Sequence, residues 1–281
     1  MEQFVDASFN RNFTQHYSLL MELERQQLAF VIYDKSTGKI AALKRITFPQ
    51  GINGSDFSSR LKNIINAEDI LHIPVKETKI SIAWPAFMLV PETLFEEELA
   101  GDYLKYNTHV AEKETTEVNY IRGLTIKNVF VIYKELKKYL SATFPNAKIF
   151  HTSTALLEYI QAHKNDMHAA QLIFDVRQDH MHIIYLENKE LKFCNQFQFK
   201  NKEDFLYFAL LVSDQLQIDR NVSDLKLCGY IIEDSVLYNE LYKFFRNIGF
   251  INTPDHLKLP AASEITSLHY YTTLFSLHLC A

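Results

Sequence analysis

Two histidines are the residues whose spacing first suggests chemistry. His180 and His182 alternate along a predicted strand, so both rings point to the same face. Two imidazoles so placed can bind a metal ion, but no third ligand lies nearby in the sequence, and a pair on a surface strand is the favoured interpretation. Cys194, Cys228 and Cys280 lie far apart without a CxxC pair, which indicates neither a zinc site nor a disulfide framework. We expect no metal and no other cofactor.

Established catalytic motifs are missing from the sequence. No GxSxG, HExxH, Walker A or GxGxxG pattern occurs, and the serines, cysteines and histidines form no triad that the sequence alone supports. His269 and His278 are nine residues apart, a spacing that puts them on opposite faces of a helix. The residue patterns by themselves therefore identify no catalytic site.

The composition is typical of a globular protein without a membrane-spanning segment. Of 281 residues, 47% are hydrophobic and 22% are charged, which is typical of a globular chain with one large domain or two ordinary ones. The formal charge of −5 lacks the basic excess of a duplex-DNA binder, so we disfavour nucleic acid as a partner. No apolar stretch reaches the roughly 20 residues that cross a bilayer, and the start shows no signal peptide. We expect a cytoplasmic protein whose membrane contact, if any, is peripheral and through a partner.

The first half of the sequence is expected to begin with a three-strand meander, followed by a helix and a strand. These elements would hold the candidate residues in place. An acidic segment then spans 92–117 with eight acids and two lysines. We interpret it as an exposed helix and loop region or a small subdomain, with a solvated face favoured over an acidic docking surface. The expected strands of this half are 17–24, 28–33, 39–48, 79–83, 129–133 and 148–150, and the expected helices are 56–71, 134–142 and 154–162.

The second half repeats this plan, which predicts a duplicated α/β architecture. Each half should hold a mixed sheet covered by helices. The expected domains are 1–165, with the acidic insertion near 92–117, and 166–281. The expected strands of the second half are 171–176, 182–186, 191–199 and 225–228, and the expected helices are 202–216, 235–247 and 263–279.

The order of elements resembles the actin-like ATPase superfamily, especially its bacterial pilus-assembly and cell-division branches. More closely, the chain is similar to an uncharacterised bacterial family with this fold. The resemblance runs from Tyr17 to the end and includes a strand–helix–strand–helix unit at Asn128–Ile160. It implies two ribonuclease-H-like halves. Each half of such a protein opens with a strand ending in Asp-x-Gly and a turn whose backbone N–H groups surround the phosphates.

This sequence departs from that pattern at its first turn, which matches the stretch from Leu20 to Gln27. Glu22 stands at the aspartate position, Glu24 stands at the glycine position, and Arg25 follows. A carboxylate at the position of Glu24 would repel a phosphate about 4 Å away by about 1 kcal/mol in water and about 4 kcal/mol at an effective dielectric of about 20. The resemblance therefore implies that ATP is not bound productively.

The second turn departs in the same way. Asp175 is retained, but Arg177 replaces the glycine and is followed by Gln178 and Asp179. A glycine pair that supports adenine and ribose in relatives matches Gly229, which is kept, and Tyr230, which replaces the second glycine.

The charged residues at these turns allow two interpretations. The simpler one is that Glu24, Arg25, Arg177 and Asp179 are exposed turn residues, joined at most by a weak ion pair. The alternative is a charged cleft that binds a small anion or a side chain of a partner.

Three functions stay open from the sequence. The leading hypothesis is a non-catalytic protein-binding or assembly module that uses a protein partner or self-association through 92–117 or the aromatic-rich second half. The runner-up is a phosphotransferase or ATPase with an unusual phosphate-binding site, in which Asp175 would be essential. The third is a metal-dependent, nuclease-like hydrolase that uses Glu22 and Asp175, although retained ancestry explains those two acids more simply.

Overall fold

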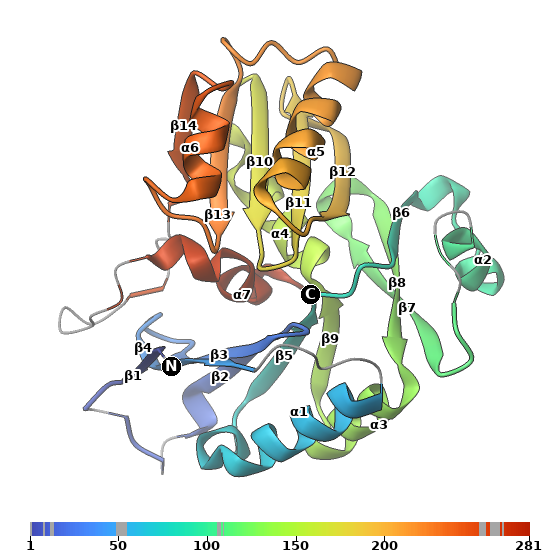
Figure 1. Ribbon diagram of the computed structural model, residues 1–281. Coiled ribbons are helices and arrows are strands. Elements are labelled where there is room, and N and C mark those ends of the chain that lie inside the picture. Colours follow the sequence, from blue (N-terminus) through green and yellow to red (C-terminus); the bar gives the residue numbers. More distant parts are fainter. Residues whose placement is uncertain are drawn as a thin grey trace. The chain divides into compact units, whose positions relative to one another are not determined.

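A computed structural model describes residues 2–7, 9–11, 14–48, 55–105, 108, 110–252, 257–258, 265 and 267–281 (Figure 1). The chain divides into two compact units. Unit 1 comprises Met1–Gln161, Asp255–Glu264 and Thr273–Ala281, and unit 2 comprises Ala162–Pro254 and Ile265–Thr272. The last nine residues therefore belong to unit 1, whereas the sequence places them in the half 166–281. The boundary expected at 165 remains a prediction.

The main sheet of unit 1 has six strands in the order β1-β4-β3-β2-β5-β9. β2 pairs antiparallel with β3 and parallel with β5, so the sheet is mixed. The meander expected between residues 17 and 48 is present as β2, β3 and β4. The strands are β1 (Glu2–Val5), β2 (Tyr17–Leu23), β3 (Gln27–Asp34), β4 (Ile40–Thr47), β5 (Glu77–Ile82) and β9 (Ala147–His151).

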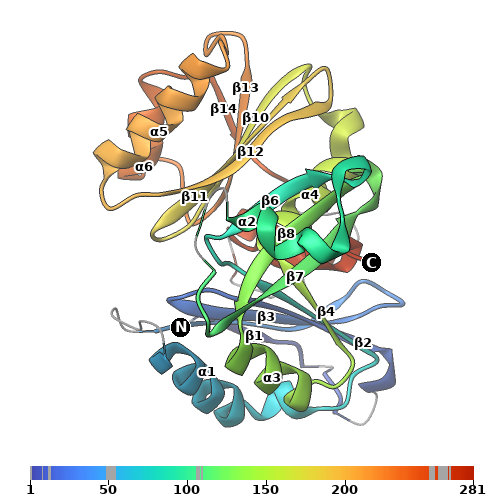
Figure 2. The same ribbon diagram turned by 90° about the vertical axis from the view of Figure 1, so that its right-hand side faces the viewer.

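The centre of this sheet is buried on both faces, as its mostly apolar strands favour. Every residue of β2 is buried, and so is every residue of β3 before Asp34. Helices α1 (Ser55–Ala67) and α3 (Lys134–Thr143) lie side by side over one face (Figures 1 and 2). Unit 1 also holds η1 (Thr14–His16) and η2 (Asp69–His72). Helix α4 (Thr152–His163) runs across the division after Gln161, and η6 (Lys164–Asp166) follows it in unit 2.

A second, smaller sheet of unit 1 was only partly foreseen from the sequence. It has the order β6-β8-β7, formed by β6 (Phe87–Pro91), β7 (Glu114–Ile121) and β8 (Ile126–Tyr133). The acidic segment is a subdomain built on this sheet rather than a helix and loop region alone. Its short helices are η3 (Glu92–Leu94), η4 (Glu97–Leu99) and α2 (Ala100–Leu104), with η5 (Arg122–Leu124) before β8.

Unit 2 holds a five-stranded sheet in the order β12-β11-β10-β13-β14. β10 pairs antiparallel with β11 and parallel with β13, which repeats the plan of unit 1. Helices α5 (Lys202–Gln215) and α6 (Val236–Tyr242) cover one face together (Figures 1 and 2). The strands are β10 (Ala170–Val176), β11 (His180–Glu187), β12 (Glu190–Gln198), β13 (Asp224–Gly229) and β14 (Asn247–Phe250).

Two expected helices of the second half differ in the structure. The helix expected over 235–247 ends at Tyr242, and the chain then forms β14, whose Ile248 pairs with Leu225 of β13. The helix expected over 263–279 is a series of short pieces from Leu268 onward, while 263–264 and 266 lie outside the described residues: η7 (Leu268–Tyr271), α7 (Thr272–Ser276) and η8 (Leu277–Leu279). Across the described part of the chain, no helix has the length and apolar character to span a bilayer.

Candidate functional site

The first predicted phosphate turn is a tight hairpin between β2 and β3 whose side chains bond to one another. The Glu24 backbone N–H donates to the Gln27 carbonyl at 2.9 Å, and Gln27 Nε2 donates to Glu24 Oε1 at 3.0 Å. Glu24 is only 4% exposed, so the interpretation of it as an exposed turn residue is wrong. Arg25 next to it is half-buried. The polar groups of this turn therefore bond to each other, and the Glu24 N–H is not available to a phosphate.

The carboxylate of Glu22 faces a distant part of its own unit. Glu22 lies near the end of β2 and is fully buried, and the Thr273 hydroxyl of α7 donates a hydrogen bond to Glu22 Oε2. Sequence reasoning missed Thr273 because 251 positions separate the two residues and no local pattern connects them. A buried carboxylate with a hydroxyl donor is a satisfied structural group.

The second predicted turn, between β10 and β11, is closed by a buried ion pair. The Arg177 backbone N–H donates to the His180 carbonyl at 2.7 Å, and Arg177 Nε donates to the two carboxylate oxygens of Asp175 at 2.9 and 3.0 Å. Arg177 is 2% exposed and Asp175 is fully buried. Arg177 is therefore not an exposed turn residue. Of the other turn residues, Gln178 is exposed and Asp179 is half-buried.

Asp175 has further partners that the sequence did not indicate. His182 Nδ1 lies 3.3 Å from Asp175 Oδ2, and Cys228 Sγ lies 3.7 Å from Oδ1. Burial by itself would raise the pKa of Asp175, but the Arg177 guanidinium and His182 outweigh it and hold that pKa well below its ordinary value. Burial lowers the pKa of His182, so this ring is neutral near pH 7. Asp175 is thus ionised, and the Arg177 guanidinium balances its negative charge.

The two histidines of the HxH pair are buried, not on a surface strand as expected. Their ring centroids lie 5.8 Å apart and nearly perpendicular, and His180 Nδ1 lies 2.7 Å from the Asp179 carboxylate. Among the residues that the structure describes, no group of three or more His, Cys, Asp or Glu side chains is arranged to hold a metal ion. The pair belongs to the network around Asp175.

The glycine after β13 has a structural reason to be retained. Gly229 has a φ of +77°, and a Cβ atom at this position would lie 2.1 Å from the Val176 carbonyl oxygen of β10. The next residue, Tyr230, donates its backbone N–H to that same carbonyl at 2.7 Å. Only glycine tolerates both this φ and this approach. Gly229 is therefore needed for the pairing of β10 with β13 whether or not a nucleotide binds.

Tyr230 completes a closed cluster in unit 2. Its hydroxyl accepts a hydrogen bond from the Arg177 guanidinium at 3.2 Å, and its ring lies 5.2 Å from the guanidinium carbon. The ring also meets Tyr270 edge to face at 5.7 Å. Asp175, Arg177 and Tyr230 thus come together through contacts in one unit, with Gly229 beside them, whereas Gln178 is exposed.

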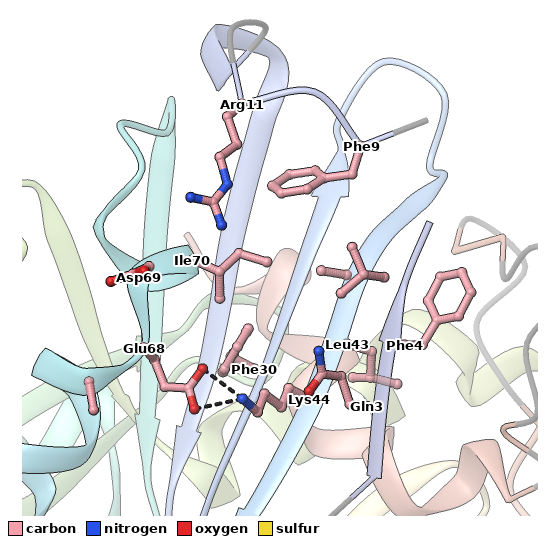
Figure 3. Close-up of a pocket in the computed structure, with 13 residues that line it drawn as sticks. Gln3, Phe4, Phe9, Arg11, Phe30, Leu43, Lys44, Glu68, Asp69 and Ile70 are labelled. Atoms are coloured by element: carbon pink, nitrogen blue, oxygen red, sulfur yellow. Dashed lines mark hydrogen bonds and ion pairs between the residues drawn. The ribbon is translucent and has the colours of Figure 1, made fainter. Parts of the chain in front are cut away.

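A pocket of about 270 Å³ lies elsewhere in unit 1, over β1, β3 and β4 (Figure 3). Phe9, Phe30 and Ile70 contribute apolar walls, while the Lys44 ammonium bonds both carboxylate oxygens of Glu68 at 2.6 and 2.7 Å. None of the nine residues predicted for the nucleotide cleft lines this pocket. Two of the charged residues that line the pocket, Lys44 and Glu68, are therefore paired with each other.

Comparisons with known proteins agree with the fold. A protein with actin-like ATPase fold and unknown function from Bacteroides thetaiotaomicron is 24% identical, with a TM-score of 0.80 over 95% of this chain and 99% of that one. A chain of the PilM-PilN type IV pilus biogenesis complex is 11% identical, with a TM-score of 0.64 over 93% and 98%. A search of curated proteins found no match.

These likenesses confirm the duplicated α/β, actin-like ATPase fold that the order of elements predicted. A family model covers most of the chain, from residue 6 to residue 248. The chain therefore belongs to the family described as "Protein of unknown function (DUF3822)".

Proposed function

We propose that this chain is a degenerate form of the actin-like ATPase fold, which does not bind ATP productively and serves in the cytoplasm as a protein-binding or assembly module. The observation that carries the proposal is the buried Asp175–Arg177 pair, closed by Tyr230, at the second predicted phosphate turn. We further propose that nucleic acid is not a partner, in keeping with the net charge of −5.

The backbone donors of both turns support this proposal. A phosphate-binding turn needs N–H groups that point at the ligand and carry no side chain in the way. Here the N–H groups of Glu24 and Arg177 each donate across their own hairpin, and the N–H of Tyr230 donates to Val176. Each of these donors would have to break a hydrogen bond before it could hold a phosphate oxygen.

The charge of Arg177 offers no substitute for the missing glycine. An arginine can bind phosphate in a bidentate manner when its guanidinium is available. In this chain Nε already bonds both oxygens of Asp175, and a terminal nitrogen bonds the Tyr230 hydroxyl. Releasing the guanidinium would leave a fully buried carboxylate without its counter-ion, which costs several kcal/mol.

A role in assembly draws support from a structural neighbour. The PilM-PilN structure is a complex of type IV pilus biogenesis, so a protein of similar fold works there through a protein partner. The exposed acids of η3 and η4 and the aromatic residues near β12 are the surfaces that we consider for such contacts in this chain.

The proposal is tested by titrating the full chain with Mg-ATP and Mg-ADP in a calorimeter, and by recording its unfolding midpoint in their presence. We expect no binding heat and no shift. A ligand at 100 times its Kd would raise the free energy of unfolding by about 2.7 kcal/mol, so even weak binding is visible at high nucleotide concentration. Micromolar binding of either nucleotide contradicts the proposal, and turnover of ATP that Asp175→Ala abolishes would favour the enzyme instead.

A further inference from the structure

The outermost strand of unit 2, β12, has an unusually open edge. It pairs with β11 on one side and ends the sheet on the other (Figure 1). Most other outer strands of the described sheets are short: β1 and β14 have four residues each, and β6 and β9 have five, with β6 ending in Pro91. β7 has eight but carries Glu114 and Glu117. β12 has nine residues and no charge from Phe193 onward, although charge is the usual protection of an edge.

The direction of the backbone groups on this edge follows from one hydrogen bond. The Phe199 N–H donates to the Asp179 carbonyl at 3.0 Å, just beyond the paired residues His180 and Gln198. Because inward and outward groups alternate in an antiparallel ladder, the N–H and C=O of residues 194, 196 and 198 point away from β11. In agreement, the Gln196 N–H donates to the Asn195 side chain at 2.8 Å and not to β11.

Aromatic side chains gather beside this edge. Phe193 and Phe197 are stacked at 6.3 Å on one face of β12, and Phe197 stacks on Phe208 of α5 at 4.9 Å. Tyr207 meets Phe208 at 5.3 Å and is 58% exposed. The open backbone edge therefore lies beside an apolar cluster that a second strand could extend.

We propose that β12 pairs antiparallel with β12 of a second copy of this chain, about a two-fold axis at Asn195. The inference deepens the assembly role and rests on that part of the proposed function. Its sequence basis is the symmetric stretch Phe193-Cys194-Asn195-Gln196-Phe197, which reads Phe-x-Asn-x-Phe in both directions. Such symmetry suits a two-fold interface, in which every contact between residue i of one copy and residue j of the other occurs a second time with the copies exchanged.

The register follows from the outward-facing residues. With the axis at Asn195, Cys194 of each copy exchanges hydrogen bonds with Gln196 of the other, since both residues point outward. The Gln196 N–H releases the Asn195 side chain to form this bond. Phe193 of each copy then faces Phe197 of the other at a non-hydrogen-bonded position, where side chains approach most closely. Moving the axis by one residue would place a phenylalanine opposite Asn195 and separate Phe193 from Phe197 of the other copy.

The two-fold axis makes Asn195 the decisive position for a test. Asn195 is exposed, so Asn195→Lys and Asn195→Asp should leave the folded unit intact. Each variant alone would bring two like charges together at the axis, and we expect its dimerisation to weaken at least about tenfold. An equimolar mixture pairs lysine with aspartate and should restore the dimer.

The measurement is the mass of the full chain by sedimentation or light scattering over a range of concentrations. We expect wild type at twice the chain mass of 32.8 kDa, each variant shifted toward the monomer, and the mixture dimeric again. Asn239→Lys and Asn239→Asp are matched controls, because Asn239 is exposed on α6, which covers another part of the sheet. Both controls should dimerise as wild type does.

Three outcomes overturn the inference: a wild type that is monomeric throughout, variants that dimerise as tightly as wild type, or a mixture that stays monomeric. The second outcome would leave a different interface and hence the assembly role standing. ATP binding by a chain that still dimerises through Asn195 would instead overturn the proposed loss of nucleotide binding and leave this interface intact.

Discussion

Replacing Arg177 by methionine should destabilise the protein strongly, because it removes the counter-ion of a fully buried carboxylate. Arg177 Nε bonds both oxygens of Asp175, and neither side chain is accessible to water. With charge centres about 4 Å apart and an effective dielectric of about 20, the attraction is about 4 kcal/mol. Breaking one side of a buried pair typically costs about 3–5 kcal/mol. We expect Arg177→Met to lower the free energy of unfolding by about 3 kcal/mol, since His182 and Cys228 stay near Asp175.

The assay is urea unfolding followed by two signals. Trp84 is the only tryptophan and lies in unit 1, whereas far-ultraviolet circular dichroism follows both units. If the units unfold separately, Arg177→Met should move the dichroism transition of unit 2 and leave the Trp84 transition in place. If they unfold together, both signals should shift equally.

Two further variants test whether the loss of stability comes from the buried Asp175–Arg177 pair. Arg25→Met changes the half-buried arginine of the corresponding turn in unit 1 and should alter stability by no more than about 0.5 kcal/mol. Asp175→Asn combined with Arg177→Met should cost less than the sum of the single changes, because the double variant leaves no buried charge unpaired. A loss below about 1 kcal/mol for Arg177→Met, or strict additivity in the double variant, would refute the account of the buried pair.

Three other outcomes are expected. Gly229→Ala should cost about 2 kcal/mol or more in urea unfolding, because its Cβ would meet the Val176 carbonyl at 2.1 Å; a neutral effect would contradict that approach. Lowering the pH from about 7.5 to about 5.5 should destabilise the protein: burial holds the pKa of His182 below its ordinary value of about 6.5, so below that pH the unfolded chain gains a proton that the folded chain does not. His182→Gln should flatten this pH dependence, and an unchanged slope would argue against the neutral ring beside Asp175. Burial raises the pKa of Cys280 to about 12, so its thiol should resist a thiol reagent at about pH 8 until urea unfolds unit 1, and rapid native labelling would disprove its burial.

The order of strands and helices could be predicted because the apolar patterns of the two meanders are strong. β3 holds a continuous apolar run from Leu28 to Tyr33, and β2 and β10 are mostly apolar, with Ser18 and Glu22 in β2 and Gln171 and Asp175 in β10. Their length and flanking turns identify them as buried strands. The eroded turn motifs were recognised from their positions after these strands. Fold and family were therefore accessible from the sequence.

The small sheet of unit 1 was harder to predict, because its strands lack a clean pattern. β7 reads ETTEVNYI and its polar residues are mostly half-buried, so its acids suggested a solvated loop. Helix α6 was extended too far since Phe244, Phe245 and Ile248 continue a helical spacing, although Ile248 pairs in a strand. In both cases pairing with another strand decided the structure, and that information is not local.

The two turns that carry the candidate residues lie where the sequence predicted turns, but the burial of Glu24 and Arg177 was not predicted. Charged residues in a turn are exposed in most proteins, so Glu24 and Arg177 were expected to be solvated. Arg177 is buried because Asp175 lies two residues before it and Tyr230 reaches it from just after the neighbouring strand β13. Neither contact of Arg177 can be recognised in the sequence, because a buried and an exposed turn residue can have the same residue type and the same neighbours along the chain.

The discontinuity of unit 1 has a consequence for how the nascent chain acquires its structure. Residues 273–281 are synthesised after all of unit 2, yet Thr273 satisfies the buried Glu22, and the buried Lys79 bonds the carbonyls of His278 and Cys280. Until these residues leave the ribosome, a carboxylate and an ammonium inside unit 1 lack these partners. Residues 162–254, which form most of unit 2, are therefore synthesised before unit 1 can be completed, although unit 1 contains the residues translated first.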